Sequence, residues 1–226
     1  MDFINGETLL VDKPLGWTSF NVVSKLRWQI KQRIGVKKIK VGHAGTLDPL
    51  ASGLLVICTG KNTKKITAFI NDNKTYTGTI LVGKTTPSFD LETDFNEEFP
   101  IHHITSELIE KVRQQFLGRI EQTPPIFSAK QIDGKRAYDM ARAGETPEMK
   151  AVSIEIQDII LKIDRFPEID FEITCSKGTY IRSFANDFGK ALNSGATLIA
   201  LRRTKSGIHV IENAKTIEAW IEEIQG

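Results

Sequence analysis

The chain has 226 residues, of which 40% are hydrophobic and 26% are charged, and its formal net charge is +2. Such a length and composition are those of a globular protein with a substantial core, and they exclude a disordered or fibrous chain. The two cysteines, Cys58 and Cys175, lie in apolar, strand-like runs. They are typical of buried thiols in a reducing compartment and lack the spacing of a disulfide framework or a metal site.

The first 82 residues combine strand and helix patterns. Apolar residues at helical spacing predict a helix over about 20–34 that is capped by Ser19. A glycine-rich loop is expected over 36–52, and a short helix from residue 62 or 63 to about 70. The strands predicted in this part are 8–12, 54–58 and 75–82.

The rest of the chain begins with an acidic stretch, 85–104, which we expect to be an irregular surface loop. Residues 126 to about 150 are rich in polar and basic groups and suggest a projecting arm, with a short helix near 135–143. Further helices are predicted from Ser106 to residue 116, over 180–192 and over about 216–224, and further strands over 152–163, 171–176 and 196–204. Because strands and helices mix without a regular βαβ alternation, the fold class is expected to be α+β.

Basic charge is distributed unevenly along the chain. Residues 24–40 contain seven basic side chains and no acidic one, whereas residues 85–110 contain seven acidic side chains and no lysine or arginine. Further basic residues lie at 61–65 and 130–142. Solvated helix faces could explain any one of these runs, but together they favour RNA as a polyanionic partner. The chain shows neither a signal sequence nor a membrane-length apolar run, so we expect a cytoplasmic protein with no membrane partner.

The most informative stretch is residues 42–53, GHAGTLDPLASG. Its one carboxylate, Asp48, lies among glycines and small residues and is flanked by Leu47 and Leu50. Pro49 restricts both its own backbone and that of Asp48, so the carboxylate is expected on a stiff loop beside apolar surface. An Asp-Pro pair also occurs in ordinary turns, where the side chain caps its own backbone.

The longer string GHAGTLDPLASGLLVICTGKNTKKI resembles the catalytic motif of the TruB family of pseudouridine synthases. Four other stretches resemble the same family in the same order: KTY at 74–76, PPIFSAK at 124–130, CSKGTYIR at 175–182 and LRR at 201–203. The resemblance covers residues 7–210. It implies isomerisation of the uridine at position 55, in the TΨC loop of tRNA, to pseudouridine, through base flipping, cleavage of the glycosidic bond and re-formation of a C-glycoside. This reaction needs neither a cofactor nor a metal.

The resemblance also implies the pseudouridine synthase core, a large mixed, mostly antiparallel sheet flanked by helices. The arm at 124–150 corresponds to the thumb loop with which the family grips an RNA hairpin. We expect a single catalytic domain over 1–226 without the C-terminal PUA domain that many members carry. The expected partner is the TΨC stem-loop of tRNA, with no protein partner required and a monomeric state.

The resemblance assigns three catalytic residues. Asp48 is the acting carboxylate, Tyr76 lies against the flipped base, and Arg182 pairs with the catalytic carboxylate and keeps it ionised. Substrate contacts are expected from further residues, which are His43, Lys64, Asp90, Tyr180 and Leu201, and from the arm residues Lys130 and Arg136. Taken singly, most of these residue types are more often structural. Attack on the sugar, attack on the base and removal of a sugar proton all remain open as the role of Asp48.

Two other functions are compatible with parts of the sequence. A non-catalytic RNA-binding protein could use the same scaffold, although the joint presence of Asp48, Tyr76 and Arg182 argues against it. A hydrolase with paired carboxylates would need a second acid in a comparable apolar loop, and the sequence offers none. Within the enzyme class, ribosomal RNA or another RNA with a similar loop is an alternative substrate.

Overall fold

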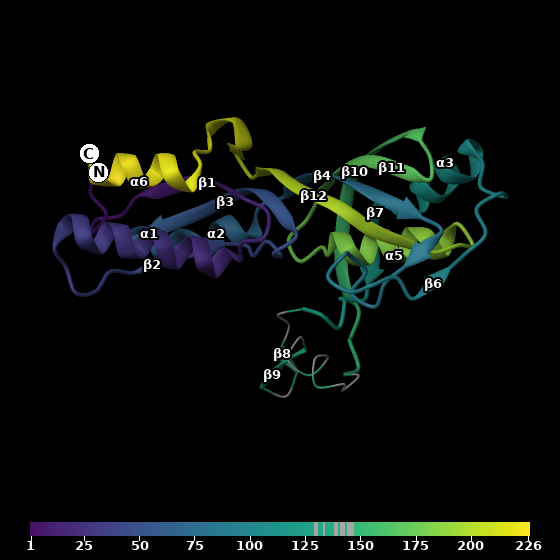
Figure 1. Cartoon of the computed structure of the whole chain (residues 1–226), viewed down its shortest axis with the longest axis horizontal. Coiled ribbons are helices and arrows are strands. Elements are labelled where there is room, and N and C mark those ends of the chain that lie inside the picture. Colours follow the sequence, from purple (N-terminus) through teal and green to yellow (C-terminus); the bar gives the residue numbers. More distant parts are fainter. Residues whose placement is uncertain (129–130, 133, 138–139, 141–142, 144–146) are drawn as a thin grey trace. The chain divides into compact units, whose positions relative to one another are not determined.

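A computed structural model of the chain describes residues 1–128, 131–132, 134–137, 140, 143 and 147–226 (Figure 1). The chain divides into two compact units. Unit 1 consists of Met1–Thr77 together with Leu201–Gly226, and unit 2 of Gly78–Ala200. The large mixed sheet and its helices confirm the α+β class expected from the sequence.

Among the described residues the main sheet has nine strands, in the order β1-β3-β12-β4-β11-β10-β7, with β2 paired to β3 and β13 paired to β12. These strands are β1 (Thr8–Lys13), β2 (Val41–Ala44), β3 (Ala51–Thr59), β4 (Lys74–Val82), β7 (Gly118–Gln122), β10 (Val152–Arg165), β11 (Glu168–Cys175), β12 (Ala196–Ser206) and β13 (His209–Val210). Strands β1 and β2 run antiparallel to β3, whereas β12 runs parallel to it, with Leu201 opposite Ala51.

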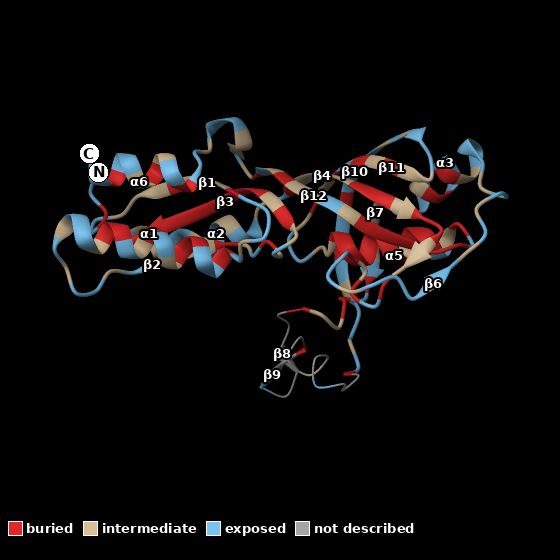
Figure 2. Ribbon diagram, in the orientation of Figure 1, coloured by how far each residue is buried: buried red, intermediate tan, exposed pale blue. Residues whose placement is uncertain are grey.

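Unit 1 is a sheet covered on both faces. Helices α1 (Ser19–Ile34) and α6 (Ile217–Gln225) pack together over one face, and the 3₁₀ helix η1 (Gly60–Lys65) leads into α2 (Ile66–Asn71) on the other. The alternation of β1 supplies both cores, because Leu9 and Val11 join the α1 side and Leu10 joins the α2 side. The red, buried side of these elements is visible in Figure 2.

The start of α1 differs from the prediction. Thr18, not Ser19, is the N-cap: its hydroxyl accepts a hydrogen bond from the backbone N–H of Asn21, whose side chain accepts from the N–H of Thr18. This reciprocal capping box satisfies two backbone donors of the first turn. Ser19 is therefore released for a different contact, which is described with the site.

Unit 2 is organised around helices α3 (Ser106–Gln115) and α5 (Ile181–Ala191). Phe184 and Phe188 of α5 form ring contacts with Phe116, and Phe184 also contacts Phe171 of β11. Such edge-to-face pairs add to the burial of apolar area. Two small two-stranded sheets complete this unit, one of β5 (Lys84–Thr85) with β6 (Glu97–Glu98) and one of β8 (Gln131–Ile132) with β9 (Lys135–Arg136).

Several predicted loops contain short strands. The loop expected over 36–52 includes β2, and the acidic loop over 85–104 includes β6. Strand β7 was not predicted at all. Glycine-rich or acidic strands of two to five residues lack the apolar alternation on which the prediction rests, and their ladder hydrogen bonds form only in the folded sheet. In the arm, residues 135–136 lie in β9, which corrects the start of the helix predicted near 135–143. Residues 137 and 140 are helical, and residues 138–139 and 141–142 lie outside the described residues.

Across the described part of the chain, no helix combines the length and apolar character needed to cross a lipid bilayer.

Gly53 lies at a close approach between the parallel strands β3 and β12. Its φ is +100°, and an added Cβ would lie 2.3 Å from the carbonyl oxygen of Arg203 and 2.8 Å from the Arg203 nitrogen. We expect Gly53→Ala to lower the free energy of unfolding by about 3 kcal/mol, because it adds a backbone clash to the cost of positive φ. Gly118→Ala is the matched control, since φ there is +84° but nothing lies within 4 Å. It should cost about 1 kcal/mol in urea unfolding, and equal losses for both variants would contradict the close approach.

Candidate active site

Asp48 lies half-buried on the loop between β2 and β3. The preceding residue, Leu47, is buried, and its backbone is held from both sides by Ser19. The Leu47 N–H donates to Ser19 Oγ at 2.9 Å, and Ser19 Oγ donates to the Leu47 carbonyl at 3.2 Å. The carbonyl of Pro49 accepts from Gly16 N–H at 2.8 Å. The loop is therefore fixed on both sides of the carboxylate, as the sequence pattern predicted.

Arg203 of β12 holds the same loop from the sheet. Its side chain is 1% exposed, and it donates from Nε to the Leu54 carbonyl at 2.7 Å and from Nη2 to the Gly45 carbonyl at 3.0 Å. Gly45 has a φ of +88°, and a Cβ there would lie 3.4 Å from Nη1 of the same guanidinium. A glycine suits this position because it tolerates that backbone angle and leaves room for the guanidinium.

A second buried cation, Lys13, lies at the end of β1. Its side chain is 0% exposed, and its Nζ donates to the carbonyls of Pro14 and Trp17. Burial lowers the pKa of Lys13 to about 8, an effect that the nearby carboxylate of Asp48 opposes and the guanidinium of Arg203 reinforces. Lys13 thus supplies positive potential beside the Asp48 carboxylate.

The other predicted residues of unit 1 are His43, Lys64, Tyr76 and Leu201. Burial, with the nearby guanidinium of Arg203, lowers the pKa of His43 and keeps its imidazole neutral. Tyr76 of β4 and Leu201 of β12 are half-buried, whereas Lys64 of η1 is exposed. The structure therefore places the guanidinium of Arg203 close to the imidazole of His43, and it leaves Lys64 exposed to solvent.

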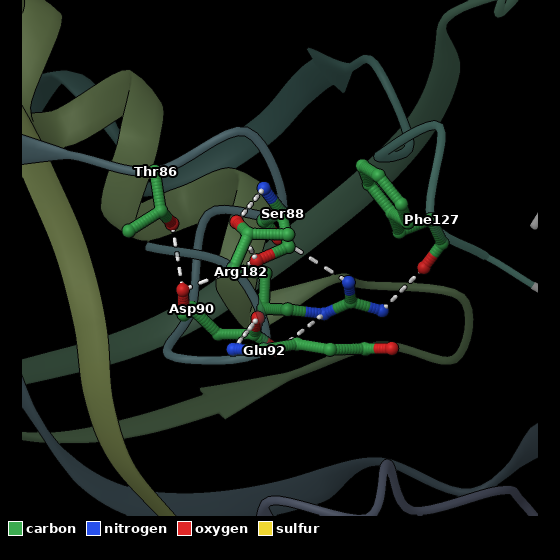
Figure 3. Close-up of polar contacts among 7 residues, drawn as sticks. Thr86, Ser88, Asp90, Glu92, Phe127 and Arg182 are labelled. Carbon is green, nitrogen blue, oxygen red and sulfur yellow. Dashed lines mark hydrogen bonds and ion pairs between the residues drawn. The ribbon is translucent and has the colours of Figure 1, made fainter. Parts of the chain in front are cut away.

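Arg182, at the start of α5, is the centre of a cluster of polar contacts in unit 2 (Figure 3). Its Nε lies 3.6 Å from Oδ2 of Asp90, and both side chains are buried. It also donates from Nη1 to the Ser88 carbonyl at 3.3 Å and from Nη2 to the Phe127 carbonyl at 2.9 Å. Asp90, a predicted substrate contact, is thus an ion-pair partner of Arg182. The expected pairing of Arg182 with Asp48 stays a prediction.

Asp90 is presented by a strained turn. Its neighbour Phe89 has a φ of +65°, a region that bulky residues adopt at a cost of about 1–3 kcal/mol. The Asp90 carbonyl accepts from the hydroxyls of Thr86 and Ser88, and its Oδ1 accepts from the N–H of Glu92 (Figure 3). The turn therefore has enough local hydrogen bonds to hold the strained residue and to aim the carboxylate at Arg182.

The remaining predicted residues lie near or in the arm. Tyr180 caps α5, and its backbone exchanges two hydrogen bonds with the side-chain amide of Gln122, at 2.8 and 3.1 Å. Arg136 belongs to β9, where only its backbone is described. Lys130 lies outside the described residues. The RNA contacts expected of Lys130 and Arg136 stay predictions.

The sequence analysis missed Lys13 and Arg203. Lysine before proline ordinarily ends a strand at the surface, and an arginine in a strand is usually exposed, so neither residue type indicated a buried cation. The one signal in the sequence that could have indicated a buried lysine is the position of Lys13 at the end of an apolar strand. In the part of the chain that the structure describes, no group of three or more histidine, cysteine or carboxylate side chains is arranged to hold a metal ion.

The pKa of Lys13 makes a pH-dependent prediction. The folded protein releases this proton near pH 8 and the unfolded chain near pH 10.5, so the unfolded state binds more protons between these values. The free energy of unfolding of the wild type, relative to Lys13→Met, should therefore rise by up to about 3 kcal/mol between about pH 7.5 and 10.5. Urea unfolding across that range measures it. Lys205→Met removes an exposed lysine of β12 as the control, and a pH-independent difference for Lys13→Met would refute the depressed pKa.

The Arg182–Asp90 pair makes a second prediction. Asp90→Asn removes a buried carboxylate from a buried guanidinium while keeping nearly the same shape. We expect it to lower the free energy of unfolding by about 2 kcal/mol. Asp94→Asn changes an exposed acid four residues away and should be neutral. Indistinguishable melting curves for the two variants would show that the pair does not support this turn.

Comparison with known proteins gives a consistent assignment. The family model described as TruB family pseudouridylate synthase (N terminal domain) matches residues 31–181. The chain is 54% identical to the tRNA pseudouridine synthase B of Phocaeicola vulgatus over 222 residues, which are 98% of this chain and 94% of that protein. It is 52% identical to the protein of the same name from Flavobacterium johnsoniae over 225 residues, covering 99% and 98% of the two chains.

The fold is similar to that of a chain in a solved structure titled "Crystal Structure of a Cbf5-Nop10-Gar1 Complex", with a TM-score of 0.72 and 28% identity. The match covers 97% of this chain and 54% of the other, so this chain spans about half the length of that one. This likeness and the family match confirm the expected pseudouridine synthase fold. The family model covers more than half of the chain and the relatives match nearly all of it, so the chain belongs to the TruB family of pseudouridylate synthases, and its expected enzyme class, an isomerase, is confirmed.

Proposed function

We propose that this enzyme converts the uridine at position 55, in the TΨC loop of tRNA, to pseudouridine, with Asp48 as the acting carboxylate. The observation that carries the proposal is the setting of Asp48. It is a half-buried carboxylate on a loop fixed by Ser19 and Arg203, with the buried cation Lys13 beside it. The relatives' name, tRNA pseudouridine synthase B, supports tRNA as the substrate.

The proposed chemistry is balanced within the substrate. The bond from N1 of uracil to C1′ of ribose breaks, the base turns, and a bond from C5 to C1′ forms. The proton leaves C5 and N1 gains one, so no group is lost and no redox change occurs. A carboxylate can serve this sequence as nucleophile or as base, and either role requires its ionised form. Positive potential from Lys13 favours that form when the nucleotide displaces water from the loop.

The proposed substrate must leave its stack to reach Asp48. Flipping a base costs a few kcal/mol, and stacking on an aromatic side chain returns about 1–3 kcal/mol. Tyr76 is the residue we assign to this stacking. His43, whose depressed pKa keeps it uncharged, is assigned to packing against the RNA loop. Arg182 is assigned to catalysis, and Tyr180 and Leu201 are assigned to contacts with the flipped base.

The proposal extends to the setting in which the enzyme works. We infer a cytoplasmic monomer that uses the TΨC stem-loop of tRNA as its macromolecular partner and needs no protein subunit. The 226 residues act as one catalytic domain. The arm over 124–150 grips the hairpin, with Lys130 and Arg136 on phosphates.

The test is incubation of the purified protein with an unmodified tRNA transcript, followed by chemical mapping of pseudouridine. We expect one pseudouridine, at position 55. A transcript with cytidine at that position is the control and should stay unmodified. Tight binding of the transcript without any isomerisation would favour the alternative of an RNA-binding protein on the same scaffold, and modification only at other sites would overturn the proposed substrate.

Asp48→Asn tests the assignment of the carboxylate. We expect the rate of pseudouridine formation to fall by at least about 10⁴-fold, because the amide can neither attack nor accept the proton. Binding of the transcript should stay within about tenfold of wild type, since the lost group acts on chemistry. Asp164→Asn alters an exposed acid of β10 and should retain full activity. Near-normal turnover by Asp48→Asn would remove Asp48 from the mechanism.

A further inference from the structure

We propose that the solvent-facing side of helix α1 and the loop after it form a second contact surface for the substrate RNA, separate from the loop that carries Asp48. We call this surface the α1 face, and it consists of Phe20, Lys25, Trp28, Lys31, Lys37, Lys38 and Lys40. The inference rests on the proposed function, because it takes RNA as the substrate. It adds a surface that binds the RNA backbone next to the target nucleotide.

The aromatic residues of α1 face solvent and do not pack in the core of unit 1. The core of unit 1 takes Val22, Val23, Leu26 and Ile30 from this helix. Trp28, by contrast, is 54% exposed, although tryptophan is a costly side chain to leave in water. Packing against the protein's own core therefore does not explain its position.

Phe20, in the first turn of the helix, is also outward-facing and is 66% exposed. Phe20 and Trp28 are eight residues apart, which places them about two turns from each other and about 80° apart around the helix axis. Figure 2 shows pale, exposed residues along the outer side of α1. The helix thus presents two aromatic rings to solvent.

Basic side chains surround these rings. Lys25 and Lys31 lie three residues before and after Trp28, which makes them its neighbours on the helix surface. No aspartate or glutamate occurs from residue 13 to residue 47. Among the described residues, the lysines of the α1 face form no ion pair, so their charge is available to an external anion.

The α1 face begins at the candidate catalytic loop. Ser19, the first residue of the helix, exchanges two hydrogen bonds with Leu47, the neighbour of Asp48. From there the helix runs for 16 residues, which is about 24 Å. Nucleic acid whose target base is at Asp48 therefore has phosphates and flanking bases within reach of Phe20 and the lysines that follow.

The chemistry of this surface favours RNA over a protein partner. Unpaired lysines interleaved with exposed aromatic rings are the combination with which proteins follow a nucleic-acid backbone and stack its bases. Protein–protein interfaces are depleted in lysine, and a second copy of this chain would bring the same positive charge against itself. Helix α6 packs against the buried side of α1. Its acidic residues Glu218, Glu222 and Glu223 therefore do not belong to the α1 face.

The test is a variant with Lys25→Ala, Trp28→Ala and Lys31→Ala, assayed with a full-length unmodified tRNA transcript at several salt concentrations. We expect Kd at about 0.1 M salt to rise about tenfold, and the slope of log Kd against log salt to fall by about two, one for each lysine. The rate at saturating RNA should stay at the wild-type value. A matched control with Lys111→Ala, Ile160→Ala and Lys162→Ala removes two exposed lysines and an exposed apolar residue from unit 2 and should change neither Kd nor slope.

A second variant and a spectroscopic signal test the α1 face even if the triple variant folds poorly. Lys37→Ala with Lys38→Ala leaves the helix intact and should also reduce the salt slope by about two. RNA should quench the tryptophan fluorescence of the wild type, and this quenching should be largely lost in Trp28→Phe. Wild-type isomerisation combined with an unchanged Kd, slope and quenching in these variants would overturn the α1 face alone. Failure of the wild type to form pseudouridine would instead overturn the proposed function, while the binding data would still judge the α1 face.

Discussion

The place of Asp48 in this structure depends on the buried guanidinium of Arg203. One side chain donates to Leu54 in β3 and to Gly45 in the loop before Asp48, so it joins the sheet to the catalytic loop. A fork of fixed donors can bridge two carbonyls in this way, whereas a lysine at the same position would hold them as a single point charge. The parallel pairing of β12 with β3 is what brings the guanidinium under the loop, and Gly53 is the residue that permits that pairing.

Two cations, Lys13 and Arg203, are buried close to each other, and this arrangement costs stability. Removing an ion from water costs several kcal/mol, and Lys13 and Arg203 recover part of that cost through hydrogen bonds to backbone carbonyls. The depressed pKa of Lys13 shows that the recovery is incomplete. Lys13 lies close enough to the half-buried carboxylate of Asp48 for the two charges to attract each other. Under the proposed function, this attraction would favour the ionised carboxylate when a nucleobase excludes water.

Much of the fold could be predicted from the sequence because it follows from local periodicity. Helices α1, α3, α5 and α6 carry apolar residues at helical spacing, and the long strands carry alternating or continuous apolar runs. Strand β2 was hidden in a glycine-rich stretch, and the N-cap was assigned to Ser19 because Thr18 and Ser19 have the same capping chemistry. Asp48 and its rigid loop were evident from glycine and proline placement. The burial of Lys13 and Arg203 was not, because desolvation depends on neighbours distant in the sequence.

Helix α1 links the two tasks that an RNA-modifying enzyme must keep apart. Thr18 caps the helix, which leaves Ser19 to hold Leu47 from the inside, while Phe20 is the first of the outward-facing aromatic and basic residues. Exposed charges are screened by salt over about 8–10 Å, whereas buried hydrogen bonds are screened far less. The grip on RNA can therefore weaken and recover with ionic conditions while the geometry around Asp48 does not change. At the start of α1, Ser19 thus supports the loop of Asp48, and Phe20 belongs to the proposed RNA-binding surface. An enzyme that must release its modified product benefits when affinity and chemistry depend on different side chains in this way.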